Sequence, residues 1–298
     1  MTLYNHSDSN KRKTWFLLSA FLIFVIGVGY VLSVFFEDPI ILYIAAFISF
    51  FSAIFSYWFS DKIVLSMSNA HELKFEDNKE IYRLVENLCI SVGMPLPKIY
   101  IINDLAPNAF ATGRNPEKAV IALTTGLIQK LEKSELEGVI AHELSHIKNY
   151  DILIATLTTI LVGTIVIISD MLSRSFLYRN SSRNSDNKNA NLVFVLLAVL
   201  ISILAPLFAY LMQFAISRKR EFLADADGAL ITRYPEGLAS ALEKIAHDPN
   251  QLRAVNKATA HLYISSPLKE KKKGFLAKAF MTHPPVEERI EALREMKI

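Results

Sequence analysis

The sequence predicts a mainly α-helical integral membrane protein with four transmembrane helices, arranged as two hairpins, and an α+β domain that contains a small β-sheet. Three observations support this fold. Hydrophobic residues occupy 52% of the 298 positions and mean hydropathy is +0.28, which is too apolar for an ordinary soluble protein. The apolar residues gather in four uncharged runs. Between the second and third runs, short apolar segments bounded by turns are typical of strands.

The four uncharged runs cover residues 14–36, 40–59, 152–169 and 192–217. A hydrocarbon core of about 30 Å requires about 20 helical residues at 1.5 Å per residue. The third run, with 18 residues, is the shortest, and Pro206 predicts a kink in the fourth. The first run is too long for the apolar region of a signal peptide, so we expect a retained anchor.

The placement of Lys and Arg beside the runs predicts the orientation of the chain. Basic residues at 11–13 precede the first run, Glu37 and Asp38 fill the short loop after it, and Lys62 follows the second run. The N-terminus and the segment after the second run are therefore expected in the cytoplasm. This topology places the basic loop 170–191 outside, so the third and fourth runs either cross the membrane or re-enter from one side.

Charge and cysteine content exclude several other classes of protein. The net charge is only +3, so no nucleic-acid partner is expected, and the basic residues favour contact with the lipid bilayer instead. The single cysteine, Cys89, excludes an internal disulfide and fits a reducing compartment. Apolar residues recur at helical spacing over residues 77–92, before Gly93, which predicts a helix with Cys89 in its buried face.

Three short strands are expected at residues 98–102, 109–112 and 119–123, with a turn at 113–117. The second strand is either an ordinary strand of small residues or an edge that pairs with an extended substrate through main-chain hydrogen bonds. In the second case its substrate-binding residues are Asn108, Ala109, Phe110 and Ala111.

The motif with the strongest indication of catalysis is His142-Glu143-Leu144-Ser145-His146. A predicted capping box at residues 134–137 starts its helix, and two histidines four residues apart share one helical face, close enough to bind a single zinc ion. Glu143 stands beside the metal without being required as a ligand. This arrangement is typical of zinc hydrolases, in which the glutamate is the general base toward a metal-activated water.

A catalytic zinc ion needs a third protein ligand from the same side of the membrane. The best candidate lies just beyond the fourth run, where Glu221 and Asp225 are four residues apart on one predicted helix. Glu221 can bind the metal, while Asp225 can accept a hydrogen bond from the free nitrogen of a ligating histidine. The alternative is a solvated acidic helix face.

Together these motifs resemble those of the HtpX-type membrane zinc metalloproteases, which are related to the CAAX prenyl proteases. The resemblance covers most of the chain and depends on the segments at 108–113 (NAFATG), 142–146 (HELSH), 220–225 (REFLAD) and 282–285 (THPP). It implies a zincin-like catalytic domain with one Zn²⁺ per chain. It also implies a multi-pass protein of the cell (inner) membrane, with the catalytic domain facing the cytoplasm. The implied substrates are proteins or peptides, above all damaged or misassembled membrane proteins in quality control.

These predictions divide the chain into four parts. They are residues 1–60 with the first hairpin, 61–151 with the sheet and the HELSH helix, 152–217 with the second hairpin, and 218–298 with the third ligand.

His283 precedes two prolines at the start of a helix expected near Val286. It is either a surface histidine or a donor that stabilises the oxyanion of the tetrahedral intermediate. The oligomeric state is not predicted.

Three other functions compete with this interpretation. A metal transporter is disfavoured because none of the expected ligands lies inside an uncharged run. A zinc-binding membrane scaffold without catalysis has no need of Glu143. A CAAX-type prenyl-protein processing protease is expected to have more than four spans.

Overall fold

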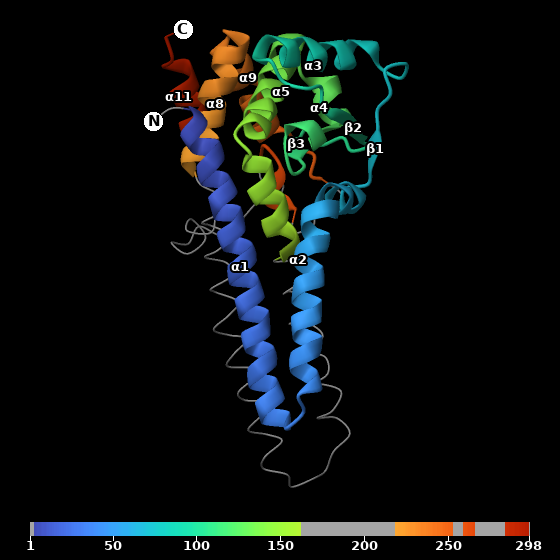
Figure 1. The fold of residues 1–298 in the computed structure, drawn as a ribbon. Helices are drawn as coiled ribbons and strands as arrows, with labels where there is room; N and C mark the ends of the chain where they lie inside the picture. The colour runs from blue at the N-terminus through green and yellow to red at the C-terminus, as the bar shows by residue number, and fades with distance from the viewer. Residues whose placement is uncertain (1–2, 162–217, 253–258, 266–283, 298) are drawn as a thin grey trace.

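The computed structural model describes residues 3–161, 218–252, 259–265 and 284–297. Two long antiparallel helices, α1 (Leu3–Phe36) and α2 (Ile40–Met67), extend away from a folded head that contains the sheet and most of the other described helices (Figure 1). Both are long and apolar enough to cross a membrane, as the first two runs predicted. Many of their large apolar side chains are exposed; examples are Tyr43, Phe47 and Phe51.

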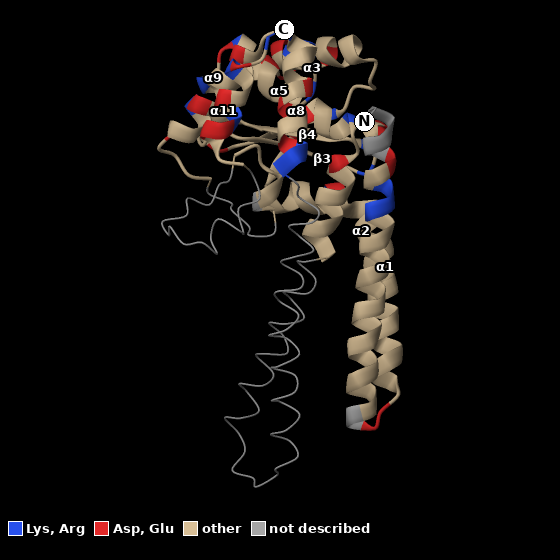
Figure 2. Cartoon of the chain, turned by 90° about the vertical axis from the view of Figure 1, so that its left-hand side faces the viewer, with Lys and Arg blue, Asp and Glu red and all other residues tan. Residues whose placement is uncertain are grey.

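The hairpin is closely packed near its turn and charged at its two ends. Gly29 lies against Ala45, where an added Cβ would overlap the alanine Cβ, so the helices can approach only because glycine has no side chain. Acidic residues mark the turn between the helices, and basic residues mark the opposite end of α1 (Figure 2). This matches the charge pattern that predicted the orientation.

Only part of the second predicted hairpin lies in the described region. Its first residues belong to a helix over Asp151–Leu161, in which Leu153, Leu157 and Leu161 pack against the side of α1. Residues 162–217, which include the rest of the third run and the whole fourth run, lie outside the described residues. The described residues therefore contain two helices that can span a membrane.

A four-stranded mixed sheet forms one layer of the head, in the order β1-β2-β4-β3. The strands β2 (Lys98–Ile102), β3 (Ala109–Thr112) and β4 (Val120–Thr124) match the three predicted strands to within one residue. β2 and β4 are parallel, and β3 runs antiparallel to β4 at the edge of the sheet. The additional strand β1 (Ala70–Glu72) follows α2 directly and pairs with β2.

The helices α5 (Lys133–Lys148), α8 (Arg218–Thr232), α9 (Pro235–His247) and α11 (Val286–Arg294) form the other layer. α5 is central, with most of its residues buried between the sheet and the later helices. α3 (Lys79–Val92) covers another side of α5 and buries Cys89, as predicted. Its N-cap is Asn78, and Gly93 ends it in the left-handed conformation. Shorter helical segments complete the head: η1 (Pro116–Lys118), α4 (Thr125–Lys130) and η2 (Ala260–Leu262).

The predicted start of α5 was wrong by two residues. The capping box is formed by Glu132 and Glu135 rather than by residues 134–137. The Glu135 carboxylate accepts a hydrogen bond from the backbone N–H of Glu132 at 2.8 Å, and it also accepts one from Lys244 on α9. Because α9 holds Glu135 at the third helical position, the helix begins at Lys133.

Candidate active site

The two helices that carry the predicted ligands lie directly against each other. α5 presents His142, Glu143 and His146, and α8 presents Glu221. Their close approach depends on Gly228 of α8, because a Cβ at that position would lie 3.0 Å from the backbone nitrogen of His142. The glycine brings the two halves of the site together although a predicted membrane hairpin separates them in sequence.

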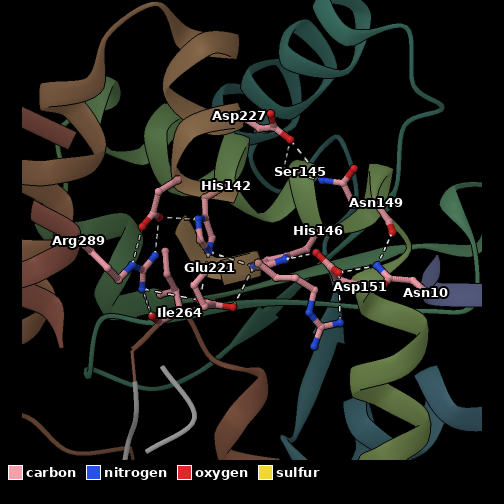
Figure 3. Close-up of polar contacts among 12 residues, drawn as sticks. Asn10, His142, Ser145, His146, Asn149, Asp151, Glu221, Asp227, Ile264 and Arg289 are labelled. Carbon is pink, nitrogen blue, oxygen red and sulfur yellow. Dashed lines mark hydrogen bonds and ion pairs between the residues drawn. The ribbon is translucent and has the colours of Figure 1, made fainter. Parts of the chain in front are cut away.

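Three donor atoms converge on one point in the arrangement that a metal ion requires (Figure 3). His142 Nε2 and His146 Nε2 are 3.2 Å apart. The carboxylate oxygens of Glu221 lie 4.0 Å from the first nitrogen and 3.5 Å from the second. Tetrahedral zinc with bonds of about 2.0 Å separates its ligand atoms by about 3.3 Å. The three side chains therefore fit a zinc ion, and they leave a fourth position open.

The other ring nitrogen of His142 faces a buried ion pair. His142 Nδ1 lies 2.9 Å from a carboxylate oxygen of Asp225. Arg289 of α11 donates two hydrogen bonds to that carboxylate, at 2.8 and 2.7 Å, and a third to the backbone carbonyl of Ile264. Burial lowers the pKa of His142 despite Asp225, and Arg289 holds the pKa of Asp225 below its ordinary value against the effect of burial. His142 is thus neutral and able to bind a metal at pH 7.

His146 has a carboxylate partner of its own, which the sequence interpretation missed. Asp151 lies 3.0 Å from His146 Nδ1, and its other oxygen accepts hydrogen bonds from Asn10 at 2.7 Å and from Arg220 at 3.3 Å. Burial lowers the pKa of His146, but Asp151 and the nearby Glu221 outweigh it and raise the pKa to about 9.

The backbone between the helices explains why helical spacing gave no indication of Asp151. An aspartate five residues beyond His146 would point elsewhere on a continuous helix. α5 ends at Lys148, however, and Tyr150 adopts φ 59°, in the left-handed region. This turn brings the carboxylate of Asp151 back toward the imidazole.

Glu143 is enclosed beside the three donor atoms. Burial and the charge of Glu221 raise its pKa to about 7, against the opposite effects of His146 and of a backbone hydrogen bond from Ala111. The adjacent cavity has a volume of about 40 Å³, enough for a few water molecules at about 10 to 15 Å³ each. A general base with a pKa near 7 in such a cavity is suited to taking a proton from water at neutral pH.

The predicted substrate strand, β3, runs along the same cavity. Ala111 lines it, whereas Asn108 lies at the end of the strand and bonds to the backbone of Ser265. The outer edge of β3 is already engaged at Ala109, whose carbonyl accepts a hydrogen bond from the N–H of Ile264 at 2.9 Å. The side chain of Phe110 is buried against Tyr263, away from the donor atoms.

A third histidine, which the sequence interpretation did not consider, lines this cavity together with His142 and His146. It is His261, whose ring is within 3.1 Å of the hydroxyl of Thr159. His283 lies outside the described residues, so its predicted role stays a prediction.

Comparison with known proteins identifies relatives that match most of the chain. The model of Peptidase family M48 matches residues 76–297. The chain is 45% identical over 296 residues to a protein named Protease HtpX homolog from Dictyoglomus turgidum, covering 99% of this chain and 95% of the relative. It is 42% identical over 302 residues to the protein of the same name from Streptococcus gordonii, covering 99% and 100%. The crystal structure of S. mikatae Ste24p is similar in fold, with a TM-score of 0.52 at 21% identity. That similarity covers 94% of this chain and 66% of the Ste24p chain.

Proposed function

The chain belongs to peptidase family M48 and is a membrane-associated metalloprotease, and we propose that it is a zinc endopeptidase whose ion is held by His142, His146 and Glu221. One observation carries the assignment. Three metal-binding atoms from two helices converge at near-tetrahedral distances beside the buried Glu143, which lies where a general base would act. A transporter or a structural zinc site has no need of a buried base with a pKa near 7.

The side chains divide the work of peptide hydrolysis between them. A bound zinc ion supplies Lewis acidity, which polarises the scissile carbonyl and makes water more acidic. Glu143 takes the proton of the attacking water and returns it to the leaving amine. Asp225 and Asp151 orient the two imidazoles through their Nδ1 atoms, so that both Nε2 atoms face the ion.

We propose that an extended peptide binds along β3, beside Ala111. The cavity of about 40 Å³ has no room for a peptide strand. The segment Tyr263 to Ser265, which occupies the edge of β3 through Ile264, must therefore move away or share that edge with the substrate. Binding through backbone groups suits substrates of varied sequence, as expected for quality control of damaged membrane proteins. His283 stays a candidate for stabilising the oxyanion.

For the membrane topology, we propose four crossings with the N-terminus and both ligand-bearing parts, 61–151 and 218–298, in the cytoplasm. The exposed apolar α1 and α2 and the charges at the ends of their hairpin support the first two crossings and the cytoplasmic N-terminus. After Cys89→Ser, a cysteine at Ser182 should react with an impermeant thiol reagent in intact cells. Cysteines at Asn69 and Pro267 should react only after permeabilisation. Opposite labelling of these last two would be incompatible with a shared zinc site.

The catalytic assignment is tested with Glu143→Gln in the full chain, purified in detergent. Glutamine keeps the shape but cannot accept the proton, so hydrolysis of fluorescently labelled casein should fall by about 10²- to 10⁴-fold, with one zinc ion still bound. Glu137→Gln, on the same helix away from the donor atoms, is the matched control and should keep full activity. Loss of zinc together with activity would make Glu143 a ligand, and undiminished hydrolysis would exclude it as the base.

A further inference from the structure

The first turns of the membrane anchor reach the metal site. Asn10 of α1 is buried, with 3% of its surface exposed. Its side-chain amide donates to Asp151 at 2.7 Å and to the backbone carbonyl of Asn149 at 2.8 Å. These contacts join residues about 140 positions apart in the sequence and bring α1 against the turn that follows α5 (Figure 3).

Asn10 contacts Asp151, and Asp151 in turn contacts the proposed zinc ligand His146. One oxygen of Asp151 faces Asn10 and Arg220, and the other faces Nδ1 of His146. The direction of that carboxylate decides which way the imidazole presents Nε2. Of its two fixed donors, the Asn10 amide forms the shorter bond, at 2.7 Å against 3.3 Å for Arg220.

The surrounding contacts show that α1 is docked at this point. The ammonium of Lys11 lies 4.3 Å from the centre of the ring of Tyr150, the residue whose left-handed conformation turns Asp151 toward His146. A buried asparagine is costly unless both of its amide hydrogens are used. Asn10 uses both on the turn at 149–151.

We propose that Asn10 is a positioning residue of the zinc site, which holds Asp151 and through it His146, so that metal affinity depends on this hydrogen bond from the membrane anchor. The inference rests on the proposed zinc-protease function. It assigns to the N-terminal segment a role in the chemistry in addition to anchoring.

The test compares Asn10→Ala with Lys11→Met in the full chain in detergent. Lys11→Met removes a contact of the same helix with the same turn without touching Asp151. Outer partners of metal ligands typically contribute 10- to 100-fold to affinity, and Asn10 is one bond farther out, so the zinc dissociation constant should rise about 3- to 10-fold in Asn10→Ala. The visible absorption of the cobalt-substituted protein should change as well. Lys11→Met should alter neither quantity.

A double-mutant cycle separates positioning from general support of the fold. If Asn10 acts through Asp151, Asn10→Ala should have no further effect on zinc affinity in an Asp151→Asn background. Additive effects, or an unchanged affinity and cobalt spectrum in Asn10→Ala, would overturn the proposal. Asn10→Leu, which keeps the branched shape, replaces the alanine variant if that does not fold. Wild-type protein that binds no zinc would overturn the proposed function itself, a result distinct from an unaffected Asn10 variant.

Discussion

The two histidines of the site are supported by different parts of the molecule. His142 faces Asp225, and Arg289 holds that carboxylate with two hydrogen bonds inside the head. His146 faces Asp151, whose other contacts come from Arg220 at the start of α8 and Asn10 of the membrane anchor. One imidazole is oriented from within the folded core, and the other by α1 and the start of α8.

This difference is also electrostatic. Arg289 is almost completely buried and lies within 3.9 Å of Glu221 as well, so one guanidinium compensates two carboxylates. The Arg220 side chain is 13% exposed and makes one longer contact. The His142 side is therefore closed around a buried guanidinium, whereas the His146 side is more open and more easily altered.

The largest expected effect is that of removing the buried guanidinium. Arg289→Met keeps the apolar length of the side chain but leaves Asp225 buried without its cation, which should cost about 3–5 kcal/mol of stability. The same change at Arg220 should cost about 1 kcal/mol, since Asp151 keeps Asn10 and its surroundings are wetter. Thermal unfolding of the two variants in one detergent provides the comparison. Equal destabilisation of the two variants would show that Arg289 and Arg220 contribute equally to stability and that the two sides of the site do not differ in this respect.

Removing each carboxylate tests the support of each ligand directly. Asp225→Asn and Asp151→Asn should both weaken zinc binding by about 10- to 100-fold, because a neutral amide supports the imidazole less well. The loss should be larger for Asp225, which is more deeply buried. Competition with a chelator of known affinity measures both. An unchanged affinity in either variant would reduce that aspartate to a surface or packing role.

Proton release distinguishes the two histidines by their pKa values. The pKa of His142 is lowered, so it carries no proton at pH 8, whereas that of His146 is raised to about 9 and the metal-free form is largely protonated there. Glu143, with a pKa of about 7, is already ionised at pH 8. Zinc binding at pH 8 should therefore release about one proton, and the apparent affinity should increase as the pH rises toward 9.

Calorimetry in buffers of different ionisation enthalpy measures that release. Asp151→Asn removes the partner that keeps the pKa of His146 high, so the released proton should largely disappear. Asp225→Asn should leave the number of protons released on zinc binding unchanged. Equal proton release by both variants would contradict the assignment of the proton to His146.

The sequence was sufficient for the parts of the site that follow helical spacing. His142 and His146, and likewise Glu221 and Asp225, are four residues apart, so each pair had to share a face wherever its helix lay. The helices and strands that carry them were predictable for the same local reasons. The short interval between Glu221 and Asp225 also suggested a metal ligand with a supporting carboxylate.

The residues that the sequence did not reveal depend on chain reversals and long-range contacts. Asp151 reaches His146 only through the left-handed conformation of Tyr150, which no pattern in the sequence predicts. Arg289 meets Asp225 from a helix 64 positions later, and Asn10 meets Asp151 from 141 positions earlier. Periodicity describes one element at a time, so it could not bring side chains from separate elements together around the proposed metal site.

The smallest effect is expected on the face of α5 that points away from the donor atoms. Ser145 lies between the two histidines in sequence, but its hydroxyl bonds to Asp227 of α8 at 3.0 Å. Asn149 donates to the same carboxylate at 3.2 Å, so Asp227 keeps a partner when the hydroxyl is removed. Ser145→Ala should therefore cost about 1 kcal/mol in stability and leave zinc affinity unchanged. Measured beside Asp151→Asn, it tests whether metal binding responds to the Nδ1 contacts alone. A weaker zinc affinity in Ser145→Ala would show that any loosening of α5 against α8 disturbs the site. The difference between the two histidines would then result from helix packing and not from their carboxylate partners.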